Sequence, residues 1–218
     1  MEVNILNKEN SVLNNFLAEM RDKQIQVDPL RFRHNIERIG ELMAYEVSKR
    51  LNFSPIDVQT PLGTAQVQLP ADKIVVGTIL RAGLPMHQGL LNIFDHAENC
   101  FISAYRKYTY SHDDLDVCLE YVATPNLEGK VLLLCDPMLA TGKSLSKTFL
   151  ALKRYGTPKH THIMSIIGSN DGVDYLRQEL SAENVTLWVA AVDKELNSHK
   201  YIVPGLGDAG DLAFGEKL

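Results

Sequence analysis

Residues 131–144 read Val-Leu-Leu-Leu-Cys-Asp-Pro-Met-Leu-Ala-Thr-Gly-Lys-Ser. The stretch opens with an apolar run that predicts a buried strand, and Asp136 follows that run directly. After a short loop, Thr141 and the next residues predict a helix start, where backbone N–H groups and the helix dipole favour an anion such as phosphate. Asp136 would bind phosphate poorly but can accept hydrogen bonds from sugar hydroxyls. A loop with both properties suits a phosphorylated sugar.

The pattern of strand, loop and helix recurs on both sides of this stretch. Apolar strands are predicted at 74–80, 101–105, 163–167 and 185–189, and a returning strand at 117–121. Apolar strands separated by helices predict an α/β fold, with a largely parallel sheet that helices cover on both faces. Ligands of such sheets bind beyond the carboxyl ends of the strands. This rule selects the segments that begin at Arg81, Arg106, Asp136 and Gly168.

The first 70 residues carry two further signals. Asp28-Pro29 predicts a helix start, because an N-cap side chain is followed by proline at the first helical position. Val58 to Leu69 predicts two short strands around the turn Pro61-Leu62-Gly63.

Two other interpretations of residues 136–144 compete with a phosphate site. In the first, Asp136-Pro137 is a simple turn and Ser144 merely caps a helix. In the second, Gly142-Lys143-Ser144 ends a Walker A loop, which would indicate a nucleotide kinase. That motif needs glycine five residues before Gly142, where this chain has Pro137, and proline removes an N–H donor from the cradle. The Walker A interpretation therefore fails, and the simple turn stays open.

Composition narrows the function classes. The chain has 218 residues, is 45% hydrophobic and carries a formal net charge of −5, so it has no general attraction for nucleic acid or anionic membranes. No signal peptide is evident, and no apolar run approaches the ~18 residues of a membrane span. Its three cysteines lack CxxC spacing, which argues against a disulfide framework or a structural zinc site. His160 and His162 have no nearby carboxylate or cysteine in the sequence to complete a metal site, so we expect no metal ion bound by the protein alone. The composition and the lack of targeting signals predict a cytoplasmic location.

A second unusual stretch lies at the C-terminus. Residues 201–215 read Tyr-Ile-Val-Pro-Gly-Leu-Gly-Asp-Ala-Gly-Asp-Leu-Ala-Phe-Gly. Four glycines in so short a stretch argue against a regular helix or strand, and a flexible tail is one interpretation. The apolar residues Ile202, Val203, Leu206 and Phe214 instead predict a segment that packs down. A backbone loop closing over a small planar base is a plausible use, because main-chain groups can bind the edge of a base specifically.

Both stretches resemble known families. Residues 131–144 are similar to the signature of type I phosphoribosyltransferases that binds 5-phosphoribosyl-1-pyrophosphate (PRPP). Pro137, in place of a second acid, resembles the uracil-specific branch, which usually has a second glycine where this chain has Lys143. The C-terminal stretch closely resembles the uracil-binding hood of uracil phosphoribosyltransferases. Arg81-Ala82-Gly83-Leu84 matches the pyrophosphate loop of the family, and Tyr105-Arg106 its second arginine.

The resemblance implies a type I phosphoribosyltransferase fold with a C-terminal hood and a β-hairpin lid. It implies that PRPP is bound by Arg81, Arg106, Asp136, Pro137, Met138, Leu139, Ala140, Thr141, Gly142, Lys143, Ser144 and Asp208. It implies uracil contacts from Ile202, Gly207, Asp208 and Ala209, and catalytic roles for Asp208, Arg81 and Arg106.

The implied reaction joins uracil to PRPP, giving UMP and pyrophosphate. Displacement at C1 of the ribose would proceed without a covalent enzyme intermediate, helped by positioning and by stabilisation of the departing pyrophosphate. Mg²⁺ is the implied cofactor and would be bound mainly through PRPP rather than by a protein cage. The implied partners are uracil and PRPP, with neither nucleic acid nor membrane, in a homodimer or homotetramer for which GTP is a candidate activator.

We expect one domain over 1–218, with N-terminal helices and a hairpin at 1–70, a PRPP-binding core at 71–195 and the hood at 196–218. Basic and aromatic residues from Lys107 to His112 precede acidic ones up to Asp116, which favours a lid over an RNA-binding surface. Two alternatives stay open. They are a phosphoribosyltransferase for another base, such as hypoxanthine or orotate, and a uracil-sensing RNA-binding regulator on the same fold.

Overall fold

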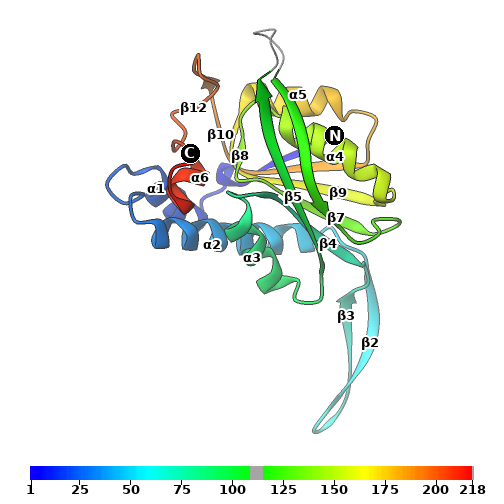
Figure 1. Ribbon diagram of the computed structural model, residues 1–218. Helices are drawn as coiled ribbons and strands as arrows, with labels where there is room; N and C mark the ends of the chain where they lie inside the picture. Colours follow the sequence, from blue (N-terminus) through cyan, green and yellow to red (C-terminus); the bar gives the residue numbers. More distant parts are fainter. Residues whose placement is uncertain (109–114, 218) are drawn as a thin grey trace.

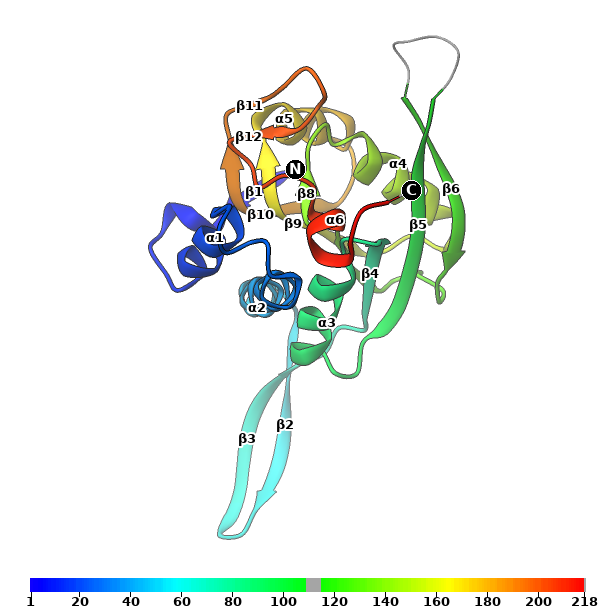
Figure 2. The same ribbon diagram turned by 60° about the vertical axis from the view of Figure 1, so that its left-hand side comes forward.

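In the computed structural model, a central sheet lies between two layers of helices (Figures 1 and 2). The structure describes residues 1–108 and 115–217, and of residues 104–108 and 115–119 it describes the backbone alone. The strands are β1 (Glu2–Ile5), β2 (Phe53–Thr60), β3 (Gly63–Pro70), β4 (Ile74–Leu80), β5 (Glu98–Tyr108), β6 (Leu115–Ala123), β7 (Val131–Cys135), β8 (Met138–Leu139), β9 (His160–Ser169), β10 (Val185–Asp193), β11 (Glu195–Leu196) and β12 (Ile202–Val203). The helices are α1 (Leu13–Arg21), α2 (Pro29–Ser48), α3 (Leu84–Ile93), α4 (Lys143–Leu152), α5 (Asn170–Glu179) and α6 (Ala209–Phe214), with 3₁₀ turns η1 (Leu6–Lys8) and η2 (Lys153–Tyr155).

The large sheet has the strand order β1-β10-β9-β7-β4-β5-β6, with β8 paired to β9. Each neighbouring pair is parallel except β5 with β6, which are antiparallel. The chain moves from β4 to β5 on one side and then returns to place β7 on the other side of β4. This reversal of strand order creates the crevice in which α/β sheets bind ligands. The prediction of a largely parallel α/β sheet is therefore confirmed.

Strand β7 shows why the sheet is covered on both faces. Val131, Leu133 and Cys135 join an apolar core with α1, α2, α3 and α6, whereas Leu132 and Leu134 join a second core with α4 and α5. Successive side chains of a strand point to opposite faces, so an unbroken apolar run needs cover on both sides. Figure 1 shows α4 and α5 on one side of the sheet and α2 and α3 on the other.

Helix α2 begins where the sequence predicts. The Asp28 carboxylate accepts hydrogen bonds from the N–H groups of Leu30 and Arg31, and Pro29 occupies the first helical turn. Among the described residues, no helix is long and apolar enough to cross a bilayer.

The predicted turn at residues 61–63 is the tip of a two-stranded hairpin. Strands β2 and β3 pair antiparallel from Phe53↔Pro70 to Thr60↔Gly63, and the hairpin projects away from the body of the molecule in both views (Figures 1 and 2). Most of its residues are exposed, including Leu62 at the tip.

Two elements differ from expectation. Glu2–Ile5 adds an edge strand that pairs parallel with Thr186–Val189 of β10, although its mixed polar sequence gave no strand signal. The expected lack of regular structure at residues 201–215 was wrong, because this segment holds β12 and the helix α6. The helix forms because three of the four glycines lie outside it, at turns with positive φ, and only Gly210 lies within.

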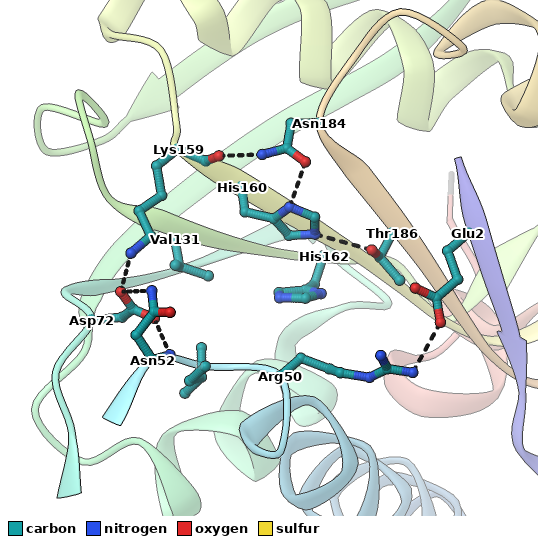
Figure 3. Close-up of a pocket in the computed structure, with 11 residues that line it drawn as sticks. Glu2, Arg50, Asn52, Asp72, Val131, Lys159, His160, His162, Asn184 and Thr186 are labelled. Carbon is teal, nitrogen blue, oxygen red and sulfur yellow. Dashed lines mark hydrogen bonds and ion pairs between the residues drawn. The ribbon is translucent and has the colours of Figure 1, made fainter. Parts of the chain in front are cut away.

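At the amino ends of the strands, opposite the edge where ligands are expected, lies a cavity of about 360 Å³ (Figure 3). His160 and His162 line it, with ring centroids 4.5 Å apart. His162 is buried and accepts a hydrogen bond from the indole N–H of Trp188 at 3.0 Å. Burial, with smaller contributions from the neighbouring His160 and Arg50, lowers the pKa of His162 to about 3.

This shift predicts that His162 destabilises the fold in acid. Below the ordinary histidine pKa of about 6.5, the unfolded chain binds a proton at this position and the folded chain does not. The free energy of unfolding should therefore fall by up to about 1.4 kcal/mol per pH unit from this residue as the pH drops from about 6.5 towards 3. Urea unfolding at pH 7 and pH 5 measures the effect, which His162→Gln should reduce. The exposed His34→Gln serves as the control, and an equal pH dependence in all three proteins would contradict the prediction.

Candidate active site

The carboxyl ends of β4 and β7 bring two of the predicted segments together. The two strands pair up to Thr78↔Cys135, so Arg81 and Asp136 follow adjacent strand ends. The turn after β4 lies against the end of β7, because a Cβ added at Gly83 would be 2.2 Å from the Thr78 hydroxyl and 3.3 Å from the carbonyl of Cys135. The peptide bond between Leu80 and Arg81 is cis.

The loop that begins at Asp136 is held by its backbone. The N–H of Asp136 donates to the carbonyl of Met164 at 3.1 Å, and its carboxylate Oδ1 accepts the N–H of Met138 at 3.1 Å. Met138 and Leu139 then pair with β9 as strand β8. Leu139 is fully buried, backbone included, so this structure exposes none of its surface to a ligand.

Helix α4 begins without a side-chain cap. Its N-cap residue is Gly142, at φ +75°, where an added Cβ would lie 2.9 Å from the carbonyl of Gly172. Because the cap position falls on Gly142, the interpretation of Ser144 as a simple N-cap is wrong. The N–H of Lys143 makes a long contact of 3.5 Å with the Thr141 hydroxyl, and the first helical turn can still present N–H groups to an anion, as the sequence predicts for a phosphate site.

Lys143 occupies the first position of α4, and its ammonium group forms no ion pair with any described residue. A cation at a helix N-terminus is unfavourable unless an anion is bound there. The position of Lys143 thus agrees with a phosphate ligand at this turn.

Ser169, at the end of β9, is a supporting residue that the sequence did not single out. Its hydroxyl donates to the carbonyl of Ala140 at 2.6 Å and accepts the N–H of Gly172 at 2.9 Å. One side chain thereby caps α5 and holds the loop of residues 136–142 against it. The sequence indicated this region only through the prediction that a ligand-binding segment begins at Gly168, the residue before Ser169.

The structure describes the predicted hood, residues 196–218, up to residue 217. Asp208 caps helix α6, and its Oδ1 accepts the N–H groups of Gly210 at 2.8 Å and Asp211 at 3.0 Å. The Ile202 and Ala209 side chains are buried, whereas Gly207 and Asp208 are exposed. Of the four predicted uracil-binding residues, Gly207 and Asp208 are therefore the ones that this structure exposes to a ligand.

Arg81 connects the hood to the end of β4. Its Nη2 lies 3.3 Å from the Asp211 carboxylate and 3.3 Å from the carbonyl of Gly215, and it lies close to Gly210. The structure thus places Arg81, the capping Asp208 and the start of the 136–144 loop at one edge of the sheet. The Arg106 side chain and the expected lid tip at 109–114 lie outside the described residues.

The comparisons with known proteins agree with this geometry. The family described as Uracil phosphoribosyltransferase matches residues 7–216 of the chain. The chain belongs to the uracil phosphoribosyltransferase family. A protein named uracil phosphoribosyltransferase from Porphyromonas gingivalis is 56% identical over 218 residues, which is 100% of both chains. One of the same name from Methanothermobacter thermautotrophicus is 40% identical over 191 residues, covering 87% of this chain and 86% of the relative.

Solved structures support the fold of this uracil phosphoribosyltransferase family member. The AQ2163 protein of Aquifex aeolicus superposes with a TM-score of 0.86 at 26% identity, covering 98% of both chains. A hypoxanthine phosphoribosyltransferase from Staphylococcus aureus superposes with a TM-score of 0.51 at 13% identity, over 75% of this chain and 76% of the other, and shares the fold alone. The resemblance stated from the two sequence stretches is confirmed.

Proposed function

We propose that the protein transfers the 5-phosphoribosyl group of PRPP to uracil, forming UMP and pyrophosphate. The observation that carries this proposal is the juxtaposition of two backbone sites at one sheet edge. The start of α4 suits a phosphate, and the hood segment at residues 202–209 has main-chain groups suited to the edge of a base. Arg81, which follows the strand beside β7, contacts the hood through Asp211 and Gly215.

Several of the predicted site residues have a definite role in this proposal. The N–H groups from Thr141 to Ser144 would hold the 5′-phosphate, and the Asp136 carboxylate would accept the ribose hydroxyls. Arg81 and Arg106 would bind the pyrophosphate, because a guanidinium group matches phosphate oxygens with two parallel hydrogen bonds.

The bond changes follow from the chemistry of the two substrates. The C1–O bond of the ribose breaks, and pyrophosphate leaves with the electron pair. N1 of uracil then forms the new bond to C1 and loses its proton. A covalent enzyme intermediate is not needed. The thiol of Cys135, at the end of β7, is buried, which raises its pKa to about 12 and keeps it protonated and unreactive.

Mg²⁺ fits the site as a companion of PRPP. Among the described residues, no group of three or more His, Cys, Asp or Glu side chains could hold a metal ion by itself. The exposed Asp208 uses Oδ1 to cap α6, which leaves Oδ2 for a metal-bound water. Mg²⁺ keeps several waters and binds substrate phosphates readily, and it would offset negative charge on the leaving pyrophosphate.

The two alternative functions have less support. The relatives named above are uracil enzymes, and the net charge of −5 disfavours an RNA-binding regulator. A cytoplasmic location is part of the proposal and suits the unpaired thiols Cys100 and Cys135.

The deciding experiment measures product formation from PRPP and Mg²⁺ with labelled uracil, cytosine, hypoxanthine or orotate in parallel. We expect UMP from uracil and at least about a hundredfold less product from each other base, because buried backbone groups left unpaired reject analogues. Product from another base would overturn the uracil assignment while keeping the PRPP site. No product from any base, together with salt-dependent RNA binding, would favour the regulator. Adding GTP to the same assay tests activation.

Asp208→Asn separates the catalytic role of this residue from its capping role. Asparagine is as good an N-cap as aspartate, so α6 should persist while the negative charge is lost. We expect kcat to fall at least about tenfold with the melting temperature little changed. Asp28→Asn is the matched control, because Asp28 caps α2 in the same way far from the site. Unchanged turnover in Asp208→Asn would remove this residue from the mechanism.

The projecting hairpin supports the proposed homo-oligomer. The cross-strand register places Ile56, Val58, Val67 and Leu69 on one face, and each is about 40% exposed. The opposite face carries Asp57, Gln59, Gln66 and Gln68. A two-stranded hairpin is marginal by itself, so an apolar face of this kind needs a partner, and we propose a second copy of this chain.

Charges placed on the two hairpin faces test this assembly. Light scattering should find the wild type as a dimer or tetramer. The double variant Ile56→Lys/Val67→Lys should dissociate to monomers, because a charge buried in an apolar interface is strongly unfavourable. The control Gln66→Lys/Gln68→Lys, on the polar face, should keep the wild-type mass. A monomeric wild type, or equal behaviour of both variants, would contradict the proposal.

A further inference from the structure

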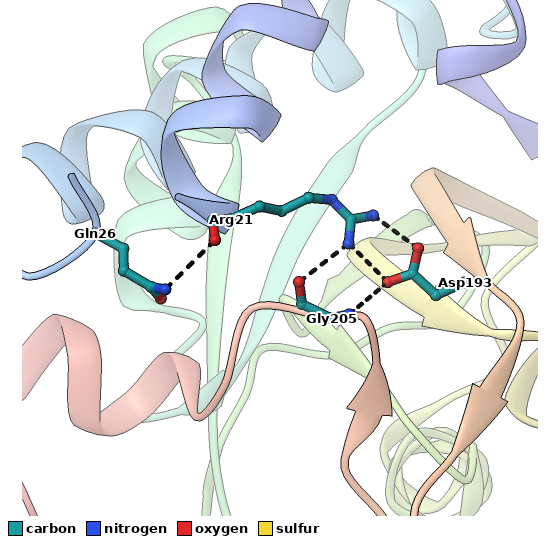
Figure 4. Close-up of polar contacts among 4 residues, drawn as sticks. All are labelled: Arg21, Gln26, Asp193 and Gly205. Atoms are coloured by element: carbon teal, nitrogen blue, oxygen red, sulfur yellow. Dashed lines mark hydrogen bonds and ion pairs between the residues drawn. The ribbon is translucent and has the colours of Figure 1, made fainter. Parts of the chain in front are cut away.

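Arg21 and Asp193 form a two-pronged ion pair beside the hood (Figure 4). Nη1 of Arg21 lies 2.7 Å from Oδ2 of Asp193, and Nη2 lies 2.8 Å from Oδ1. Arg21 is the last residue of α1, and Asp193 is the last residue of β10. The Asp193 side chain is only 8% exposed, so the carboxylate depends on these partners for its charge.

The same pair binds both polar backbone groups of Gly205. The N–H of Gly205 donates to Oδ2 of Asp193 at 2.8 Å, and its carbonyl accepts from Nη1 of Arg21 at 3.0 Å. Gly205 is buried at φ +55°, and an added Cβ would lie 2.1 Å from the carbonyl of Ile202. The pair and the close approach to Ile202 together fix the path of the backbone at this residue.

Gly205 lies at the entry to the segment that is proposed to bind the base. Gly207, Asp208 and Ala209 follow it after one buried residue, Leu206. The far end of the hood is held separately, because Nη1 of Arg33 in α2 donates to the carbonyl of Ala213 at 2.7 Å. The Arg21–Asp193 pair therefore acts on the backbone just before residues 207–209, not on the C-terminal end of α6.

We propose that Arg21 and Asp193 are positioning residues for uracil, which set the backbone of residues 207–209 through Gly205. The inference rests on the proposed function and names residues outside the predicted site. Hydrogen bonds from main-chain groups to the edge of a base weaken steeply with misalignment, so a shift of the backbone should weaken uracil binding. Among the described hydrogen bonds and ion pairs, none joins the pair to the loop at residues 136–144, so PRPP binding should weaken less than uracil binding.

Two single variants and one double variant test the proposal. In Asp193→Asn the amide oxygen can still accept a hydrogen bond, but the charge that holds Arg21 is lost. Arg21→Lys keeps the charge but lacks the fork that reaches both Asp193 and Gly205. The double variant Arg21→Asp/Asp193→Arg restores opposite charges, but it leaves the carbonyl of Gly205 without its donor and the N–H without its acceptor.

A matched control is provided by Arg31, which pairs with Glu19 through Nε at 2.9 Å and a second contact through Nη2. Like Arg21–Asp193, that pair involves a residue of α1, which it joins to α2. Neither Arg31 nor Glu19 contacts the hood in the described hydrogen bonds and ion pairs. Arg31→Ala therefore removes a pair of similar geometry from the same part of the molecule.

The measurements are KM for uracil, KM for PRPP, kcat and the melting temperature of each folded variant. We expect Asp193→Asn and Arg21→Lys to raise KM for uracil about 10- to 100-fold, with a smaller rise in KM for PRPP that comes through Asp208. The double variant should recover the wild-type melting temperature but not the wild-type KM for uracil. Arg31→Ala should leave KM for uracil unchanged.

Three results would overturn the inference while the proposed function stands. They are an unchanged KM for uracil in the folded single variants, an equal rise in both KM values, and a double variant that recovers uracil binding together with stability. A wild type that forms no UMP from uracil would instead overturn the proposed function itself.

Discussion

Parallel pairing of β4 with β7 is the constraint on which the rest of the structure depends. The pairing brings two strand ends to one edge, so that Arg81 and Asp136 begin adjacent loops. At that edge the turn after β4 lies directly against Thr78 and Cys135, because Gly83 has no side chain that would clash with them. The two apolar cores on either face then determine where the flanking helices lie, and with them the start of α4.

The backbone of the hood is held by side chains rather than by pairing with the main sheet. Much of its backbone does not join the main sheet, so its carbonyl groups need donors from elsewhere. Three arginines supply them: Arg21 binds the carbonyl of Gly205, Arg33 that of Ala213 and Arg81 that of Gly215. A segment rich in glycine is thereby held in one path by side chains from three distant elements. Such an arrangement suits a surface that must present main-chain groups to a small ligand.

The sequence predicted the sheet and the strand, loop and helix start of residues 131–144 well because their signals are local. The apolar run at 131–135, the Asp28-Pro29 helix start and the glycine turn at residue 142 each act within a few residues. The missed features depend on contacts between distant positions. Strand β1 forms because β10 offers an open edge, and α6 forms because Asp208 and Arg33 satisfy its two ends. The partnership of Arg21 with Asp193 spans 172 positions, and no local pattern indicates it.

Segments far apart in the sequence meet in this fold, which sets an order for its maturation during synthesis. Strand β1 and Arg21 are synthesised before β10 and Gly205, which they contact. The contact of Arg21 with Gly205 joins residues 184 positions apart, so it can form only after residue 205 has been synthesised. The segment proposed to bind the base is consequently fixed late, by residues that were synthesised long before it.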